Sequence, residues 1–225
     1  MGISIKTTTD PEDAALFIAT SVIDKLKLGK HVLLFMTGGS SVVVGVKVAK
    51  FLRENIDEKI ISNLTITLTD ERYGIVGHSD SNWQQLIDRG FDLPKAKLIP
   101  VLIGADKKIT TQKFNEELNE EFMREGYKIG MFGIGADGHT AGVLPNSDAI
   151  SSSDFAFSYD TPTFSRITIT PKAIEKLDEA VVWVQGEDKW PILKDLEKDI
   201  DIKKQPAQIL KKVPLLKIFT NYKKE

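Results

Sequence analysis

Residues 31–41, HVLLFMTGGSS, join a short apolar run to a loop of glycine and hydroxyl residues. The length of His31–Met36 and its content of Val and Leu predict a buried β-strand. Residues 42–53 follow the loop and predict a buried helix despite their valines. A strand, a tight loop and a helix in this order form the first part of a βαβ unit.

The same alternation continues along the chain. Further strands are predicted at Leu64–Leu68, Lys128–Ile134, Arg166–Thr170, Ala180–Val184 and Val213–Phe219. Helices are predicted from Pro11 to Gly29 with Asp10 as N-cap, over Thr110–Arg124, and over Trp190–Leu196. Strands separated by helices imply an α/β fold whose sheet is largely parallel, with helices on both faces. Because no linker divides the sequence, we expect one domain over residues 1–225, with a mobile loop at Asn146–Phe155 near the site.

The composition shows no strong charge bias. Lys and Arg total 30 against 32 Asp and Glu among 225 residues, which gives a net charge of −2. This balance gives no indication of a nucleic-acid or membrane partner. Cysteine is absent, which excludes disulfides, thiol catalysis and cysteine metal sites, and fits the cytoplasmic location that we expect.

Ligands of parallel α/β folds bind beyond the carboxyl ends of the strands, and the first polar cluster at such a place is Gly38-Gly39-Ser40-Ser41. Glycines let the backbone approach an anion, and the free N–H groups at the start of the next helix attract negative charge. The alternative interpretation is a tight turn in which a serine caps the helix. The nucleotide-binding pattern GxxxxGK[ST] does not occur.

The second cluster is Asp70-Glu71-Arg72, with Asp80-Ser81-Asn82 ten residues later. Asp70 and Glu71 are well placed to hold a polyhydroxylated ligand. Arg72 is well placed to contact a phosphate or a developing oxyanion. A solvated loop with a local ion pair is the alternative. His78 lies in this loop, is expected to be exposed, and is assigned no role.

The third cluster is GIGADGHT, residues 133–140. It matches the dinucleotide-binding pattern GxGxxG, but Pro145 leaves too little room for the full helix that such a site requires. A histidine in this loop suits a general base instead, and Asp137 is placed to orient the imidazole of His139. The alternative is a turn with a hydrogen-bonded histidine. Arg166 and Lys189 are ordinary surface charges if taken singly, but together with the glycine loop they could complete an anion site.

The strings TGGSS, TDERYGIVGHSDSN, GIGADGHTAGVLP, RITIT, QGEDK and QPAQIL span residues 37–210 and resemble, in order, those of the 6-phosphogluconolactonases. The resemblance implies a three-layer α/β fold with a Rossmann-like sheet, in the group of glucosamine-6-phosphate deaminase, ribose-5-phosphate isomerase and the coenzyme A transferases. It also implies hydrolysis of 6-phosphogluconolactone, a small phosphorylated sugar lactone of the pentose phosphate pathway, with no cofactor and no metal. We expect a monomer or a small homo-oligomer.

The resemblance also assigns the site residues. It makes His139 the base that activates water, with Asp137, Asp70 and Arg72 as the other catalytic residues. It assigns the substrate and its phosphate to Gly38, Gly39, Ser40, Ser41, Asn82, Arg166 and Lys189. The chain departs from the family pattern in having Ser41-Val42 where Thr-Pro is usual, and Gly142-Val143-Leu144 where Ser-Leu-Phe is usual.

Three other functions compete with this interpretation. A glucosamine-6-phosphate deaminase would carry a glutamate shortly after the histidine and an aromatic residue in place of Arg72, and this chain has neither. A non-catalytic sugar-phosphate sensor of a transcription regulator would carry a helix-turn-helix, for which the chain has no basic segment. A metal hydrolase would show HExxH or a similar spacing of ligands, which does not occur.

Overall fold

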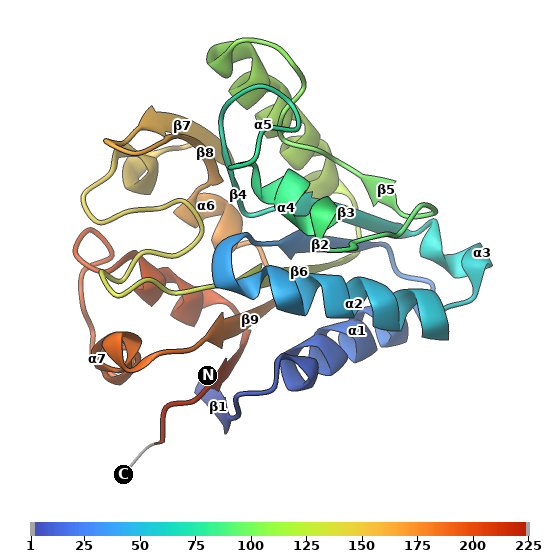
Figure 1. Ribbon diagram of the computed structural model, residues 1–225, viewed down its shortest axis with the longest axis horizontal. Helices are drawn as coiled ribbons and strands as arrows, with labels where there is room; N and C mark the ends of the chain where they lie inside the picture. The colour runs from blue at the N-terminus through green and yellow to red at the C-terminus, as the bar shows by residue number, and fades with distance from the viewer. Residues whose placement is uncertain (1–2, 224–225) are drawn as a thin grey trace.

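The computed structural model describes residues 3–223, so residues 1–2 and 224–225 of the predicted domain lie outside it. The main sheet has seven strands in the order β1-β10-β9-β6-β2-β3-β5, and all neighbours in it run parallel (Figure 1). These strands are β1 (Ile3–Thr7), β2 (Val32–Met36), β3 (Leu64–Leu68), β5 (Lys97–Leu98), β6 (Tyr127–Phe132), β9 (Glu179–Val184) and β10 (Leu215–Thr220). The predicted α/β fold with a largely parallel sheet is confirmed.

The helices alternate with these strands. The longer ones are α1 (Pro11–Lys27), α2 (Val42–Asn55) and α5 (Lys107–Met123). The shorter ones are α3 (Glu58–Ile61), α4 (Asn82–Asp88), α6 (Pro171–Ile174) and α7 (Trp190–Asp195). Four 3₁₀ segments are η1 (Gly39–Ser41), η2 (Asp148–Ser151), η3 (Glu187–Lys189) and η4 (Pro206–Lys212). As predicted, Asp10 caps α1: its carboxylate accepts a hydrogen bond from the Glu12 amide at 2.9 Å.

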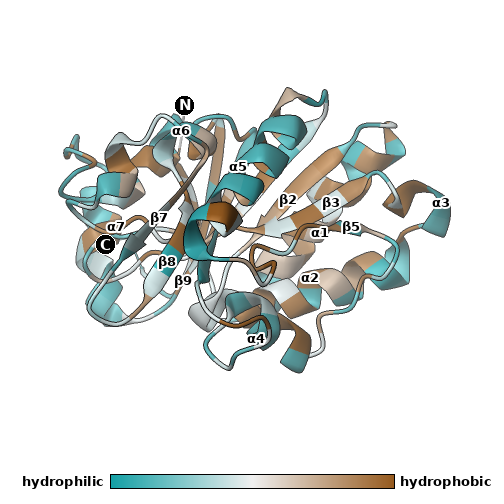
Figure 2. Cartoon of the chain, turned by 90° about the horizontal axis from the view of Figure 1, so that it is seen from above, coloured by the Kyte–Doolittle hydropathy of each residue, from teal (hydrophilic) through white to brown (hydrophobic). Residues whose placement is uncertain are grey.

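The apolar strand β2 explains why the sheet is covered on both faces. All five of its side chains are buried, and successive side chains of a strand point to opposite faces. Phe35 stacks on Phe122 of α5 with ring centroids 6.0 Å apart, whereas Met36 packs beside Gly45 of α2. Figure 2 accordingly shows α1 and α2 on one side of β2 and β3, and α5 on the other.

The chain reverses its direction of travel across the sheet between β2 and β6. From β2 it proceeds outward through β3 to β5, and then returns to place β6 on the other side of β2. Such a switch point leaves a crevice at the carboxyl ends of the two strands, because their following loops diverge. Two loops leave this crevice. The glycine-serine loop, residues 37–41, follows β2, and the histidine loop, residues 133–147, follows β6.

A second sheet corrects one prediction. Arg166–Thr170 was expected to add to the parallel sheet, but β8 (Ser165–Ile169) instead lies between β4 (Asp70–Arg72) and β7 (Ala156–Asp160) in an antiparallel sheet. The reason is the tight turn before β8, in which the Thr161 amide donates to the Phe164 carbonyl at 2.8 Å. A short turn of this kind joins only antiparallel strands.

The remaining differences are local. Strand β10 begins at Leu215, two residues later than the predicted run from Val213, and β6 ends at Phe132 rather than Ile134. The segment Asn146–Phe155 contains η2 and buries Ala149, so part of it is regular structure, and its mobility stays a prediction. No helix within residues 3–223 is long and apolar enough to cross a membrane.

Candidate active site

A cavity of about 330 Å³ lies where the loops after β2, β3 and β6 meet. It contains every residue that the sequence predicted for substrate binding, together with His139, Asp70 and Arg72. It is lined by Thr37, Gly38, Gly39, Ser40, Ser41, Asp70, Arg72, Asn82, Gly133, Ile134, Gly135, His139, Ala141, Arg166 and Lys189. Asp137 does not line the cavity but contacts His139, so the structure brings the whole predicted set together.

His139 is paired with Asp137. Its Nδ1 lies 2.5 Å from Asp137 Oδ1, and its backbone amide donates to the same oxygen at 3.1 Å. Burial opposes ionisation of Asp137, but the hydrogen bonds and charge of His139 outweigh it and lower the pKa of the carboxyl group. The ionised carboxylate favours the tautomer with hydrogen on Nδ1, which leaves Nε2 as the free acceptor. The ring packs on Gly135, where an added Cβ would lie 2.2 Å from it.

The histidine loop is irregular over residues 133–147, which agrees with the rejection of a dinucleotide site. The Gly135 amide donates to the His139 carbonyl at 3.0 Å, which closes a tight loop. Within the same loop, the Thr140 hydroxyl donates to the Gly133 carbonyl at 2.9 Å. A pyrophosphate site would need a helix N-terminus here.

The side-chain hydroxyls of Tyr159 on β7 and Thr168 on β8 form hydrogen bonds to the histidine loop. Ala141 has a φ of 50°, an uncommon conformation for a residue with a Cβ. The next residue, Gly142, donates its amide to Thr168 Oγ1 at 3.0 Å and accepts a hydrogen bond from Tyr159 OH at 2.5 Å. Tyr159 OH also accepts from the Leu144 amide at 3.3 Å. Both backbone polar groups of Gly142 are therefore fixed by side chains of β7 and β8.

Asp70 is a buried carboxylate in the cavity wall. It is 5% exposed, and its Oδ2 lies 3.5 Å from Arg166 Nη1. Burial raises the pKa of Asp70, against the opposing effects of Arg166, Thr69 and His139. The side-chain Nδ2 of Asn82 donates to the Asp70 carbonyl at 2.9 Å, while its buried Oδ1 has no hydrogen-bond partner within residues 3–223. A ligand hydroxyl would satisfy that oxygen.

The cavity carries more positive than negative charge. Arg72, Arg166 and Lys189 contribute cations, and Asp70 is the carboxylate among the lining residues. Lys189 Nζ lies 3.0 Å from the Asp188 carboxylate outside the cavity. This excess favours an anionic ligand.

The glycine-serine loop does not behave as an ordinary helix cap. Ser41 occupies the N-cap position of α2, but its side chain makes no capping hydrogen bond and lies 3.5 Å from the Trp183 carbonyl. Ser40 is exposed on the loop. Gly38 has no room for a Cβ, which would lie 2.0 Å from Asn82 Oδ1. Because η1 leads directly into α2, the Val42 amide already donates to the Gly39 carbonyl, and the amides without a side-chain cap that can face an anion are those at the start of η1.

Two expectations about the second cluster were wrong. Glu71 is fully buried and does not face the cavity. Its carboxylate accepts hydrogen bonds from the amides of Arg72, Asn82 and Trp83 and from the Ser81 hydroxyl, at 2.7–3.0 Å, so it anchors the start of α4. His78 is half-buried rather than exposed, with Nε2 3.0 Å from the Arg72 carbonyl.

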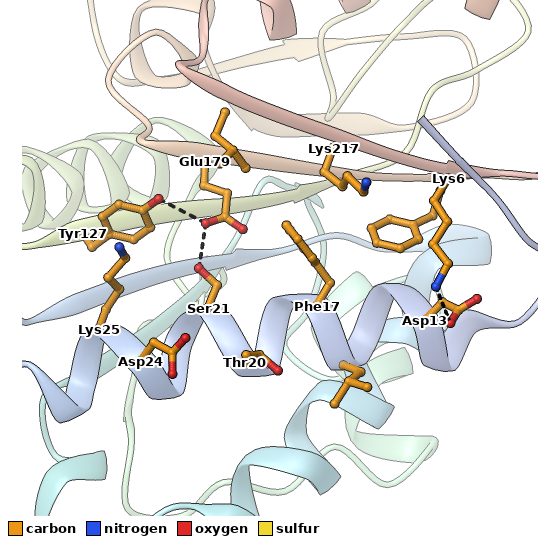
Figure 3. Close-up of a pocket in the computed structure, with 13 residues that line it drawn as sticks. Lys6, Asp13, Phe17, Thr20, Ser21, Asp24, Lys25, Tyr127, Glu179 and Lys217 are labelled. Atoms are coloured by element: carbon orange, nitrogen blue, oxygen red, sulfur yellow. Dashed lines mark hydrogen bonds and ion pairs between the residues drawn. The ribbon is translucent and has the colours of Figure 1, made fainter. Parts of the chain in front are cut away.

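A groove of about 580 Å³ between α1 and strands β1 and β10 is separate from this site (Figure 3). Its polar end is Glu179, which accepts hydrogen bonds from Ser21 Oγ at 2.6 Å and Tyr127 OH at 3.1 Å. Burial raises the pKa of Glu179. None of the predicted site residues lines this groove. In the part of the chain that the structure describes, no group of three or more His, Asp or Glu side chains is arranged to hold a metal ion.

Comparisons with known proteins show which sequences and which fold the chain resembles. A 6-phosphogluconolactonase from Borreliella burgdorferi is 25% identical over 206 residues, which cover 87% of this chain and 86% of that protein. One from Chlamydia pneumoniae is 28% identical over 132 residues, so the match spans 56% of this chain and about half of the chlamydial protein, 50%. The crystal structure of a 6-phosphogluconolactonase from Shewanella baltica has the same fold, with a TM-score of 0.79 at 21% identity over 97% of this chain and 98% of that one.

The family model described as glucosamine-6-phosphate isomerases/6-phosphogluconolactonase matches residues 10–216, which include the whole small sheet and every residue of the cavity. The chain belongs to the glucosamine-6-phosphate isomerase/6-phosphogluconolactonase family.

Proposed function

We propose that this chain is a 6-phosphogluconolactonase, which hydrolyses 6-phospho-D-glucono-1,5-lactone to 6-phosphogluconate in the pentose phosphate pathway. The names of its curated relatives support the substrate. The observation that carries the proposal is that the His139–Asp137 pair opens on the same cavity as Arg72, Arg166 and Lys189. A general base beside an excess of cations suits hydrolysis of an ester in an anionic substrate.

The phosphate is assigned to the glycine-serine loop. There the N–H groups at the uncapped start of η1 and the hydroxyls of Ser40 and Ser41 offer donors, and Arg166 and Lys189 supply charge. Asp70 and Asn82 Oδ1 then accept hydrogen bonds from the sugar hydroxyls. Such buried acceptors favour a hydroxylated ring over an apolar one.

Neutral His139 removes a proton from a water molecule through Nε2 as the water oxygen attacks the lactone carbonyl carbon. Asp137 stabilises the imidazolium that results. The carbonyl oxygen becomes an oxyanion, which Arg72 and backbone N–H groups stabilise. The tetrahedral intermediate then collapses with cleavage of the bond from the carbonyl carbon to the ring oxygen, and His139 returns its proton to that oxygen. The product acid ionises and releases one proton to solvent.

The proposal includes the setting of the enzyme. We infer that it acts in the cytoplasm as a monomer or small homo-oligomer, and that its reaction requires neither a cofactor nor a nucleic-acid or membrane partner. The near-zero net charge of −2 is consistent with this.

A comparison of two lactones tests the proposal. The phosphorylated lactone is generated in situ, and its loss is followed above the spontaneous rate for the full chain; glucono-1,5-lactone is the matched substrate without phosphate. We expect strong acceleration for the phosphorylated lactone and a much higher KM for the other. Absence of acceleration for either, together with conversion of glucosamine 6-phosphate, would assign the chain to the isomerase branch of the family instead.

A further inference from the structure

Arg72 and Arg166 lie opposite each other on the adjacent strands β4 and β8. They are direct register partners in the antiparallel pair β4–β8, and both line the cavity. Like charges directly opposite each other on paired strands repel. Each guanidinium also has a buried Nε without a hydrogen-bond partner in the described part of the chain. The pair is therefore costly unless another group offsets the repulsion.

Phe164 contacts both of these arginines. Its ring centroid lies 4.7 Å from Arg72 Cζ and 5.7 Å from Arg166 Cζ, within the range of cation–π attraction. The residue is fixed by its turn, where its amide donates to Thr161 Oγ1 at 3.0 Å and its carbonyl accepts from the Thr161 hydroxyl at 2.8 Å. The backbone of Phe164 is thus fixed independently of the arginines.

Each guanidinium has a second anchor besides the ring. Arg72 Nη1 donates to the Asp80 carbonyl at 3.0 Å, and Arg166 Nη1 lies 3.5 Å from Asp70 Oδ2. The ring supplies the contact that the two arginines share. Phe164 is not one of the residues that line the cavity, so any effect on a ligand passes through the arginines.

We propose that Phe164 is a positioning residue, whose ring holds Arg72 and Arg166 in one preorganised cationic wall of the cavity, with Arg166 turned to the phosphate and Arg72 to the developing oxyanion of the substrate. Unlike the Asp70 carboxylate beside Arg166, the aromatic ring attracts both cations without adding a negative charge that would compete with a ligand. Without the ring the two side chains would separate, and an anion would have to order them on binding. The inference rests on the proposed function only for the identity of the ligand, a sugar phosphate.

Binding measurements on ring and non-ring variants test this role. Phe164→Leu and Phe164→Met remove the ring, Phe164→Tyr keeps it, and Phe51→Leu removes a ring from α2 as a matched control. The dissociation constant for 6-phosphogluconate, and separately for inorganic phosphate, is measured by calorimetry beside the melting temperature. We expect roughly tenfold weaker binding for the Leu and Met variants, and near wild-type binding for the Tyr and control variants.

The outcomes separate this role from packing and from the proposed function. Wild-type affinity in a folded Leu or Met variant would overturn the inference, as would equal weakening in the Tyr variant. If Phe164→Leu fails to fold, Phe164→Met decides in the same way. If the wild type binds inorganic phosphate with this pattern but does not accelerate lactone hydrolysis, the proposed function fails while the role of Phe164 stands.

Discussion

At the scale of single residues, neighbouring carboxylates differ in role because their surroundings differ. Asp70 lies in the cavity wall beside Arg166, whereas Glu71 points the other way and accepts four hydrogen bonds. Alternation along β4 produces this difference, since successive side chains of a strand leave opposite faces. From the sequence alone both acids were predicted to contact a ligand. The sequence does not show that the start of α4 lies over Glu71 and donates hydrogen bonds to it.

Replacement of Glu71 tests that reassignment. Glu71→Gln would present an amide N–H₂ group to a cluster of donors, and we expect a loss of roughly 2–4 kcal/mol in the free energy of unfolding. Urea denaturation measures this loss. Full stability with loss of hydrolysis would instead place Glu71 in the chemistry.

Asp137 permits a sharper test at the same scale. In Asp137→Asn the neutral amide cannot stabilise the imidazolium of His139, so we expect kcat to fall on the order of tenfold to a hundredfold. The dissociation constant of 6-phosphogluconate should change little, because Asp137 does not line the cavity. An unchanged kcat would mean that the pair at 2.5 Å is structural only.

At the scale of elements, the small antiparallel sheet supports the loop from the parallel one. Tyr159 on β7 and Thr168 on β8 fix Gly142, three residues after His139. We expect Tyr159→Phe to lower kcat roughly tenfold, because the loss of its two hydrogen bonds to the loop, each worth about 1 kcal/mol, frees the loop that carries the base. Steady-state kinetics measures it, with Phe157→Leu on the same strand as a control for loss of packing. Wild-type kcat in Tyr159→Phe would show that the loop needs no such support.

The elements also show what sequence can predict. Strands such as His31–Met36 were recognisable because burial on both faces gives a continuous apolar run. The site was predictable because the carboxyl ends of parallel strands share one edge, so Gly38, Asp70 and His139 must meet there. Tyr159, Phe164 and Thr168 carried no such signal, because their contacts depend on an antiparallel hairpin that the RITIT run did not reveal.

At the scale of the whole molecule, an ionic cluster around the buried carboxylate of Glu121 lies at the opposite end of the sheet, where β2 begins. Glu121 is 3% exposed; its carboxylate lies 2.7 Å from His31 Nε2 and 3.0 Å from Lys97 Nζ. Burial opposes ionisation, but these hydrogen bonds and charges lower the pKa of Glu121 from 4.5 to about 2. Because the pKa of Glu121 differs between the folded and the unfolded chain, this cluster makes the folding stability depend on pH.

The cluster gives a prediction with a defined pH window. Because the folded-state pKa of Glu121 lies below its ordinary value, ionisation stabilises the native state above about pH 4.5, and the contribution is lost as the pH falls toward about 2. We expect Glu121→Gln to cost roughly 3 kcal/mol at pH 7, and the difference from wild type to shrink below pH 4.5. Urea unfolding at pH 7, 4 and 3 measures it. A difference that is the same at all three values would contradict the linkage.

The proposed function depends most on His139, the base that we assign to a phosphorylated-lactone hydrolase. Its most direct test follows the loss of 6-phosphogluconolactone, above the spontaneous rate, for the wild type and His139→Ala, with 6-phosphogluconate binding as the control for an intact site. We predict rapid hydrolysis by the wild type and a fall in kcat of at least a hundredfold in the variant, with binding retained. Undiminished hydrolysis by a folded His139→Ala protein would contradict the claim.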